Sequence, residues 1–151
     1  MARSTRWCSS MPSAVHQELS FGNVRSASAH ALITKSLIDS LTGPRRSAPT
    51  LRGAIEAGER IVLPALVLYE WLRGPRVPAE ITAQEALFPS ESAIPFGPEE
   101  AALSAELYRT LRRPRGREID LAIAACAILR NAALWTLNTV DFADVPRLKL
   151  R

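Results

Sequence analysis

The chain has 151 residues, which fits one domain, and 47% of them are hydrophobic, which is enough for that domain to form its own core. The net charge is +4, and of the 19 basic residues only Lys35 and Lys149 are lysine. Because the planar arginine fork suits phosphate, this composition favours a nucleic acid or an acidic protein as partner. No apolar run approaches the about 20 residues of a membrane span. The two cysteines, distant in sequence, fit neither a disulfide framework nor a zinc site. We therefore expect a cytoplasmic protein that does not contact a membrane.

Residues 1–28 are rich in Ser, Arg and Ala, contain a single acid at Glu18, and show no helical or strand periodicity. We interpret them as an irregular or disordered extension. A targeting segment would also be poor in acids and rich in Arg, and a translated stretch upstream of the true start would have the same composition. The predicted domain covers residues 29–151.

From residue 29 onward, short apolar runs alternate with helical stretches bounded by Pro and Gly. We expect strands at residues 31–33, 60–63, 92–95, 133–137 and 148–150. We expect helices at residues 36–41, 49–57, 65–73, 78–87, 98–113 and over 119–129. Strands that alternate with helices predict an α/β domain with a parallel sheet between helical layers.

The stretch 119–129 is apolar on every side of a helix except at Asp120, and a helix that is apolar all round is a buried helix. An ionised carboxylate is costly in such a place unless it is paired or bound to a cation. Pro114 and Gly116 end the preceding helix, so Asp120 lies in the first turn of the next. There the helix dipole favours an anion by ~0.3–1 kcal/mol, and this ordinary role is the alternative to a functional one.

Three acids follow strand ends, and ligands of a parallel sheet bind at the carboxyl ends of its strands. Glu70 follows strand 60–63, Asp120 begins the buried helix, and Asp141 follows strand 133–137. Alone, Glu70 could pair with Arg73 and Asp141 could be a turn residue. Clustered carboxylates usually hold a hard cation such as Mg²⁺ or Mn²⁺. Such an ion can activate a water for attack on a phosphodiester, and Asn138 could orient that water or a phosphate oxygen.

The segments 63–74, 118–125 and 136–142, each around one of these acids, resemble successive motifs of PIN-domain proteins. The closing segment 145–150 also matches, and the likeness, which covers residues 31–151, is closest to VapC-type toxins. The resemblance implies a three-layer α/β/α sandwich with a short, mostly parallel central sheet. It also implies a metal-dependent endoribonuclease that uses Mg²⁺ or Mn²⁺, cleaves RNA, forms a homodimer and is neutralised by a cognate antitoxin.

The same resemblance implies that Glu70, Asp120 and Asp141 are metal-site acids, with Asn138 and Thr136 in supporting roles. Family members usually begin with a strand that ends in Asp, and Ile33 stands at that place here. Asp39 cannot replace this acid, because it lies roughly 9 Å further along the next helix at 1.5 Å per residue. A catalytically impaired module that binds RNA or an antitoxin without cleavage is therefore the alternative function.

Arginines gather before the Asp120 helix. Arg109, Arg112 and Arg113 are spaced i, i+3 and i+4 on the helix expected at 98–113, and Arg115 and Arg117 follow in the loop. We predict that the last four of these contact the RNA backbone. A solvated helix face and a dock for an acidic antitoxin segment are alternatives. A nucleotide-binding enzyme of similar architecture is disfavoured, because no Gly-rich phosphate loop follows a strand.

Overall fold

The computed structural model describes residues 30–33, 36–42 and 47–151, so the predicted extension at residues 1–28 lies outside the described residues. The strands are β1 (His30–Ile33), β2 (Arg60–Val62), β3 (Ala133–Trp135) and β4 (Lys149–Leu150). The α-helices are α1 (Ser36–Leu41), α2 (Ala48–Glu56), α3 (Ala65–Leu72), α4 (Pro78–Leu87), α5 (Pro98–Thr110) and α6 (Glu118–Leu129). Two 3₁₀ helices complete the described part, η1 (Ser90–Ser92) and η2 (Val140–Phe142).

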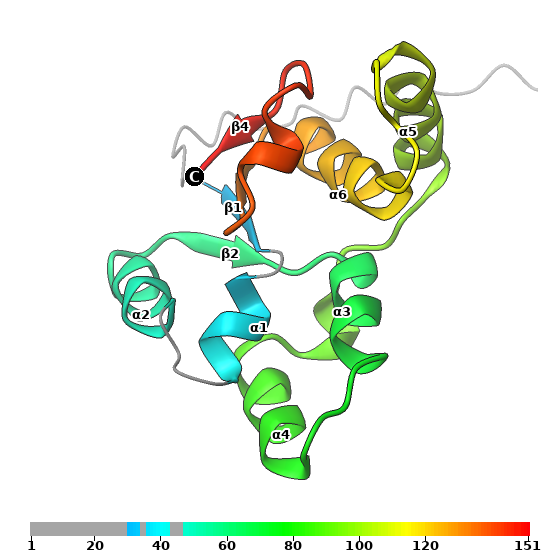
Figure 1. Cartoon of the computed structure of the whole chain (residues 1–151). Helices are drawn as coiled ribbons and strands as arrows, with labels where there is room; N and C mark the ends of the chain where they lie inside the picture. The colour runs from blue at the N-terminus through cyan, green and yellow to red at the C-terminus, as the bar shows by residue number, and fades with distance from the viewer. Residues whose placement is uncertain (1–29, 34–35, 43–46) are drawn as a thin grey trace, which may run out of the picture.

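The strands form one sheet in the order β2-β1-β3-β4, with every neighbouring pair parallel. Figure 1 shows β1 and β2 near the middle of the molecule, with the helices around them. Leu32 of β1 is in register with Val62 of β2 and Leu134 of β3. The parallel sheet expected from the alternating pattern is therefore confirmed. Since all strands run the same way, their carboxyl ends lie at one edge of the sheet, where the following loops and helix starts meet.

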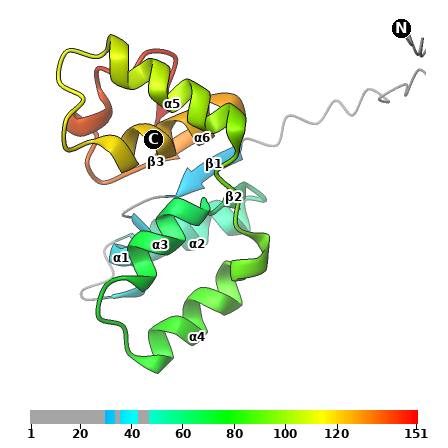
Figure 2. The ribbon, with the colours of Figure 1, turned by 90° about the vertical axis from the view of Figure 1, so that its right-hand side faces the viewer.

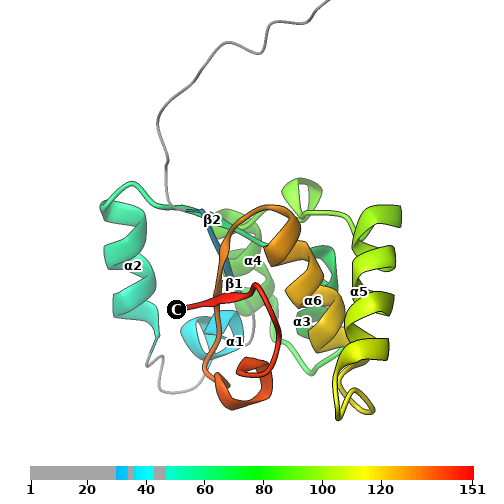
Figure 3. The same cartoon turned by 90° about the horizontal axis from the view of Figure 1, so that it is seen from above.

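Helices cover both faces of the sheet. Figure 3 shows α2 on one side of the strands and α3, α6 and α5 on the other, which gives three layers. Helix α6 packs against β3, α3 and, most extensively, α5. Helix α4 lies at the end of the molecule away from α5 and α6 (Figure 2). Between α4 and the α1–α2 pair is a hollow of about 780 Å³, lined by apolar side chains such as Leu51, Val77 and Leu87.

Helix α6 is the centre of the core, as its all-round apolar sequence predicts. Every residue from Leu121 to Ala127 is buried, and Trp71 of α3 and Leu134 of β3 join the same cluster. Burial raises the pKa of the Cys126 thiol to about 11, so this side chain stays protonated and is a packing residue rather than a nucleophile. No helix in the described part of the chain is both long and apolar enough to span a bilayer.

Two expectations about elements are wrong. The strand expected at 92–95 is a single parallel bridge between Ile94 and Pro64, because η1 ends at Ser92 and helix α3 begins at Ala65, directly after Pro64. The helix expected to reach Arg113 ends at Thr110, since Pro114 disfavours helical geometry in the residue before it. Arg112 and Arg113 therefore lie in a loop and do not extend the helix face of Arg109.

Candidate functional site

Asp120 is the third residue of α6 and is half-buried. A tight turn precedes the helix, with a hydrogen bond of 3.1 Å from the Arg117 amide to the Pro114 carbonyl. Gly116 stands in this turn with φ +80°, a value that residues with a side chain rarely adopt. The turn thus fixes where α6 begins, and it places the carboxylate of Asp120 at the positive end of a buried helix.

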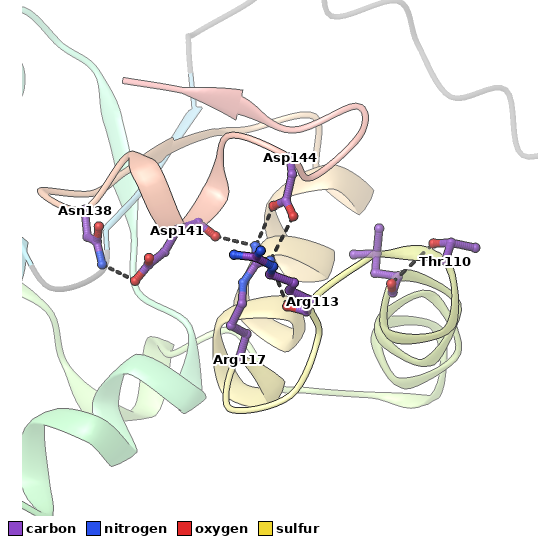
Figure 4. A network of polar contacts seen from close by, with 7 residues as sticks. Thr110, Arg113, Arg117, Asn138, Asp141 and Asp144 are labelled. Carbon is purple, nitrogen blue, oxygen red and sulfur yellow. Dashed lines mark hydrogen bonds and ion pairs between the residues drawn. The ribbon is translucent and has the colours of Figure 1, made fainter.

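Asp141 lies in η2, in the loop after β3, and is also half-buried. The buried Thr136 follows β3 directly, and its Oγ1 accepts a hydrogen bond of 3.1 Å from the Asn138 amide. The side-chain amide of Asn138 donates to Oδ2 of Asp141 (Figure 4). Thr136 therefore shapes the loop, and Asn138 orients the carboxylate of Asp141.

Arg117, at the N-cap of α6, connects three segments of the chain (Figure 4). Its guanidinium donates to both carboxylate oxygens of Asp144, at 2.9 Å from Nη1 and 2.6 Å from Nη2. Nη2 also donates to the carbonyl of Asp141, and Nη1 donates to the carbonyl of Arg113 at 3.2 Å. The sequence placed Arg117 among the RNA contacts, but its side chain is 17% exposed and has these internal partners. The prediction of RNA contact therefore narrows to Arg112, Arg113 and Arg115.

The electrostatics show that two of the three predicted acids share a neighbourhood. The hydrogen bond to Asp144 raises the pKa of Arg117, and the charges of Asp144, Asp141 and Asp120 raise it further against the opposing effect of burial. The same hydrogen bond holds the pKa of Asp144 below its usual range. The charges of Asp120 and Asp141 thus act on one guanidinium, although Asp120 lies at the start of α6 and Asp141 in η2, after β3.

Glu70, the third predicted acid, is half-buried on α3, a helix that packs against α6. Among the described residues, no three His, Cys, Asp or Glu side chains are grouped so that they could hold a metal ion. Ile33 is the last residue of β1, an interior strand, and pairs with Trp135 of β3. Two grouped carboxylates suit an ion that is also held by a substrate phosphate, as Mg²⁺ commonly is.

Arg112, Arg113 and Arg115 are exposed in the loop between α5 and α6. Together with Tyr108 and Pro114 they line a hollow of about 500 Å³. The carbonyl of Arg113 accepts a hydrogen bond from Arg117, so the basic loop is anchored beside the acids of α6 and η2. Sequence reasoning missed Asp144, because it lies 27 residues from Arg117 and no local spacing connects the two.

Comparisons with known proteins identify the family. The sequence model of the PIN domain matches residues 34–148. Ribonuclease VapC19 of Mycobacterium tuberculosis is 34% identical over 118 residues, which cover 77% of this chain and 94% of that relative.

Solved structures show the same fold. A toxin-antitoxin complex from Klebsiella pneumoniae matches with a TM-score of 0.60 at 26% identity, over 78% of this chain and 94% of that one. VapBC-1 from nontypeable Haemophilus influenzae matches with a TM-score of 0.62 at 22% identity, over 81% of this chain and 96% of that one. These matches confirm the PIN-like α/β/α sandwich. The chain therefore belongs to the PIN-domain family, among its VapC-type members.

Proposed function

We propose that this protein is a metal-dependent endoribonuclease toxin of a VapBC-type toxin-antitoxin pair, which uses Mg²⁺ or Mn²⁺ to hydrolyse RNA phosphodiester bonds. The observation that carries the proposal is Arg117 at the start of α6, beside an exposed arginine loop: its guanidinium donates to the Asp141 carbonyl, and the charges of Asp120 and Asp141 both raise its pKa. The likeness to a curated ribonuclease over 94% of that relative's length supports the same reaction.

Each polar residue of the site has a defined task in this proposal. Asp120 and Asp141 would hold the ion, with Glu70 on the adjacent helix as the third predicted ligand. The bound ion supplies an activated water and neutralises charge on the phosphorus. Asn138 keeps the Asp141 carboxylate oriented through its hydrogen bond. Arg112, Arg113 and Arg115 bind the phosphates that flank the cleaved bond.

Replacing Asp120 tests the proposal directly. With single-stranded RNA and Mn²⁺, we expect cleavage by the wild type and a loss of at least about 100-fold in kcat for Asp120→Asn, since a charged carboxylate ligand becomes a neutral amide. Glu118→Gln is the matched control, because it removes an exposed carboxylate from the same helical turn. Equal cleavage by wild type and Asp120→Asn would remove the proposal.

A catalytically impaired module is the second candidate, and Ile33 is the observation that favours it. The residue ends an interior strand at the place where family members carry an Asp. In the same assay, a large gain in Mn²⁺ affinity and cleavage by Ile33→Asp would show that the natural chain lacks a needed ligand. If the wild type is active and Ile33→Asp leaves its cleavage rate unchanged, the site works without that acid.

The proposal includes a cognate antitoxin, a homodimer and a cytoplasmic location. The antitoxin is supported by the toxin-antitoxin complexes among the solved relatives. The hollow between α4 and the α1–α2 pair suits an apolar segment of such a partner, since Ile55, Val77 and Leu87 on its walls are about half exposed. Light scattering of the purified chain, alone and with the protein encoded beside it, measures both assemblies.

A further inference from the structure

Arg117 is the one side chain in the described part of the site that touches both the basic loop and the acidic loop. Its side chain is only 17% exposed, so it does not contact the substrate directly. Its donors instead reach the Arg113 carbonyl in the loop between α5 and α6, the Asp141 carbonyl in η2 and the Asp144 carboxylate just after η2. Among the described residues, no hydrogen bond between backbone groups joins the start of α6 and the loop before it to residues 138–144.

The contacts are directional rather than merely ionic. Two of the acceptors are backbone carbonyls, which fix the path of the chain and not the position of a charge. A guanidinium presents its donors in a rigid planar fork, so one group can hold several acceptors in a fixed mutual geometry. An ammonium carries the same charge on a single atom and cannot reproduce that fork.

The ion pair itself stabilises the fold modestly. The Asp144 side chain is 48% exposed, and solvent screens such a pair. The consequence of the cluster is therefore geometric. It sets where the loop with Arg112, Arg113 and Arg115 stands relative to the carboxylate of Asp141.

We propose that Arg117 is the positioning residue of the site, which fixes the arginine loop and the Asp141 loop in register against the start of α6. This inference deepens the proposed function and rests on it for its effect on RNA cleavage. The loop register itself is a property of the fold that can be measured without cleavage. RNA phosphates held by the arginine loop are thereby placed over the acids.

The test compares Arg117→Gln and Arg117→Lys with Arg130→Gln. Arg130 is the matched control, because it caps the other end of α6 and also pairs with a carboxylate, that of Glu100, at 2.8 Å. We expect amide hydrogen exchange to accelerate in both residues 111–116 and 138–144 for the two Arg117 variants, and in neither segment for Arg130→Gln. Melting temperatures identify any effect of general destabilisation. Arg117→Lys should not rescue the register, since it keeps the charge but not the fork.

In the RNA cleavage assay, the Arg117 variants should lose about 100-fold in kcat/KM, the scale expected for misplacement of about 1 Å, while Arg130→Gln stays near wild type. Full rescue by Arg117→Lys, or exchange that accelerates in only one of the two segments, would overturn the inference. Absence of metal-dependent cleavage by the wild type would instead count against the proposed function, and the exchange measurement would still decide the role of Arg117.

Discussion

Asp120 is stabilised at its position in an otherwise apolar helix by two separate electrostatic effects. It stands in the first turn of α6, where the exposed N–H groups of the helix favour an anion. It also acts on the charged Arg117, whose pKa rises in response. A structural reason for the acid and a functional one are therefore compatible. The helix dipole and Arg117 make the carboxylate tolerable without a metal, and under the proposed function the same carboxylate would bind the cation.

Glu100 is a second acid whose environment makes a testable prediction. It is 7% exposed, and its Oε1 accepts from Arg130 while Oε2 accepts a 2.9 Å hydrogen bond from the Gly97 amide. The hydrogen bond from Arg130 holds the pKa of this carboxyl below its ordinary value of 4.5. A depressed folded-state pKa means that the stabilisation is complete above the unfolded pKa and is lost as pH falls through the folded one.

We therefore expect Glu100→Gln to lower the free energy of unfolding by about 1–3 kcal/mol at neutral pH, and the difference from wild type to shrink as the pH falls below about 4.5. Urea unfolding at a series of pH values measures this. Glu99→Gln, at the exposed neighbouring position, is the control and should show little effect at any pH. A destabilisation that is independent of pH would contradict the assigned cause.

At the scale of elements, Pro and Gly made the boundaries predictable where they act locally. Helix α4 begins at Pro78 and ends at Leu87, as expected from the sequence alone. Prediction failed where two distant segments decide the outcome. The segment 92–95 is apolar enough for a strand, but its partner Pro64 lies directly before helix α3, so the ladder cannot continue beyond one bridge. Such a partner cannot be read from the segment itself.

Helix α2 offers a paired test of backbone conformation. Gly58 follows its C-cap with φ +77°, and the amides of Gly58 and Glu59 bond the carbonyls of Ile55 and Ala54 in a Schellman arrangement. We expect Gly58→Ala to destabilise the protein by about 1 kcal/mol, because the left-handed conformation penalises a Cβ. Gly53→Ala, inside the same helix and with open space around the added Cβ, should stabilise it by about 0.5–1 kcal/mol. Melting curves of both variants suffice, and shifts of the same sign would refute this account.

For the whole molecule, the alternation of strands and helices predicted the parallel sheet and its two helical layers, because each element carries its own signal. The site was only partly predictable. Its acids follow strand ends, which the sequence locates, and Asp120 and Asp141 do act on a common group. The pairing of Arg117 with Asp144 joins positions 27 residues apart. It depends on how the loop after η2 folds back on α6, and no periodicity encodes that return.

The arginine-rich loop predicts how RNA binding depends on salt. If Arg112, Arg113 and Arg115 each neutralise one RNA phosphate, each contributes about 0.7 to the slope of log affinity against log salt for a single strand. The triple variant with Gln at all three positions should therefore bind single-stranded RNA more weakly, with a slope reduced by about 2. Fluorescence anisotropy in EDTA measures binding without cleavage.

Arg60→Gln is the control. Arg60 is exposed at the amino end of β2, whereas the acids follow the carboxyl ends of the strands. If RNA binding depended only on the net charge of +4, all arginines would be equivalent. The slope would then change by the same amount per residue for Arg60→Gln as for the loop variants. A slope that changes only with the loop variants locates the RNA path beside Asp120 and Asp141.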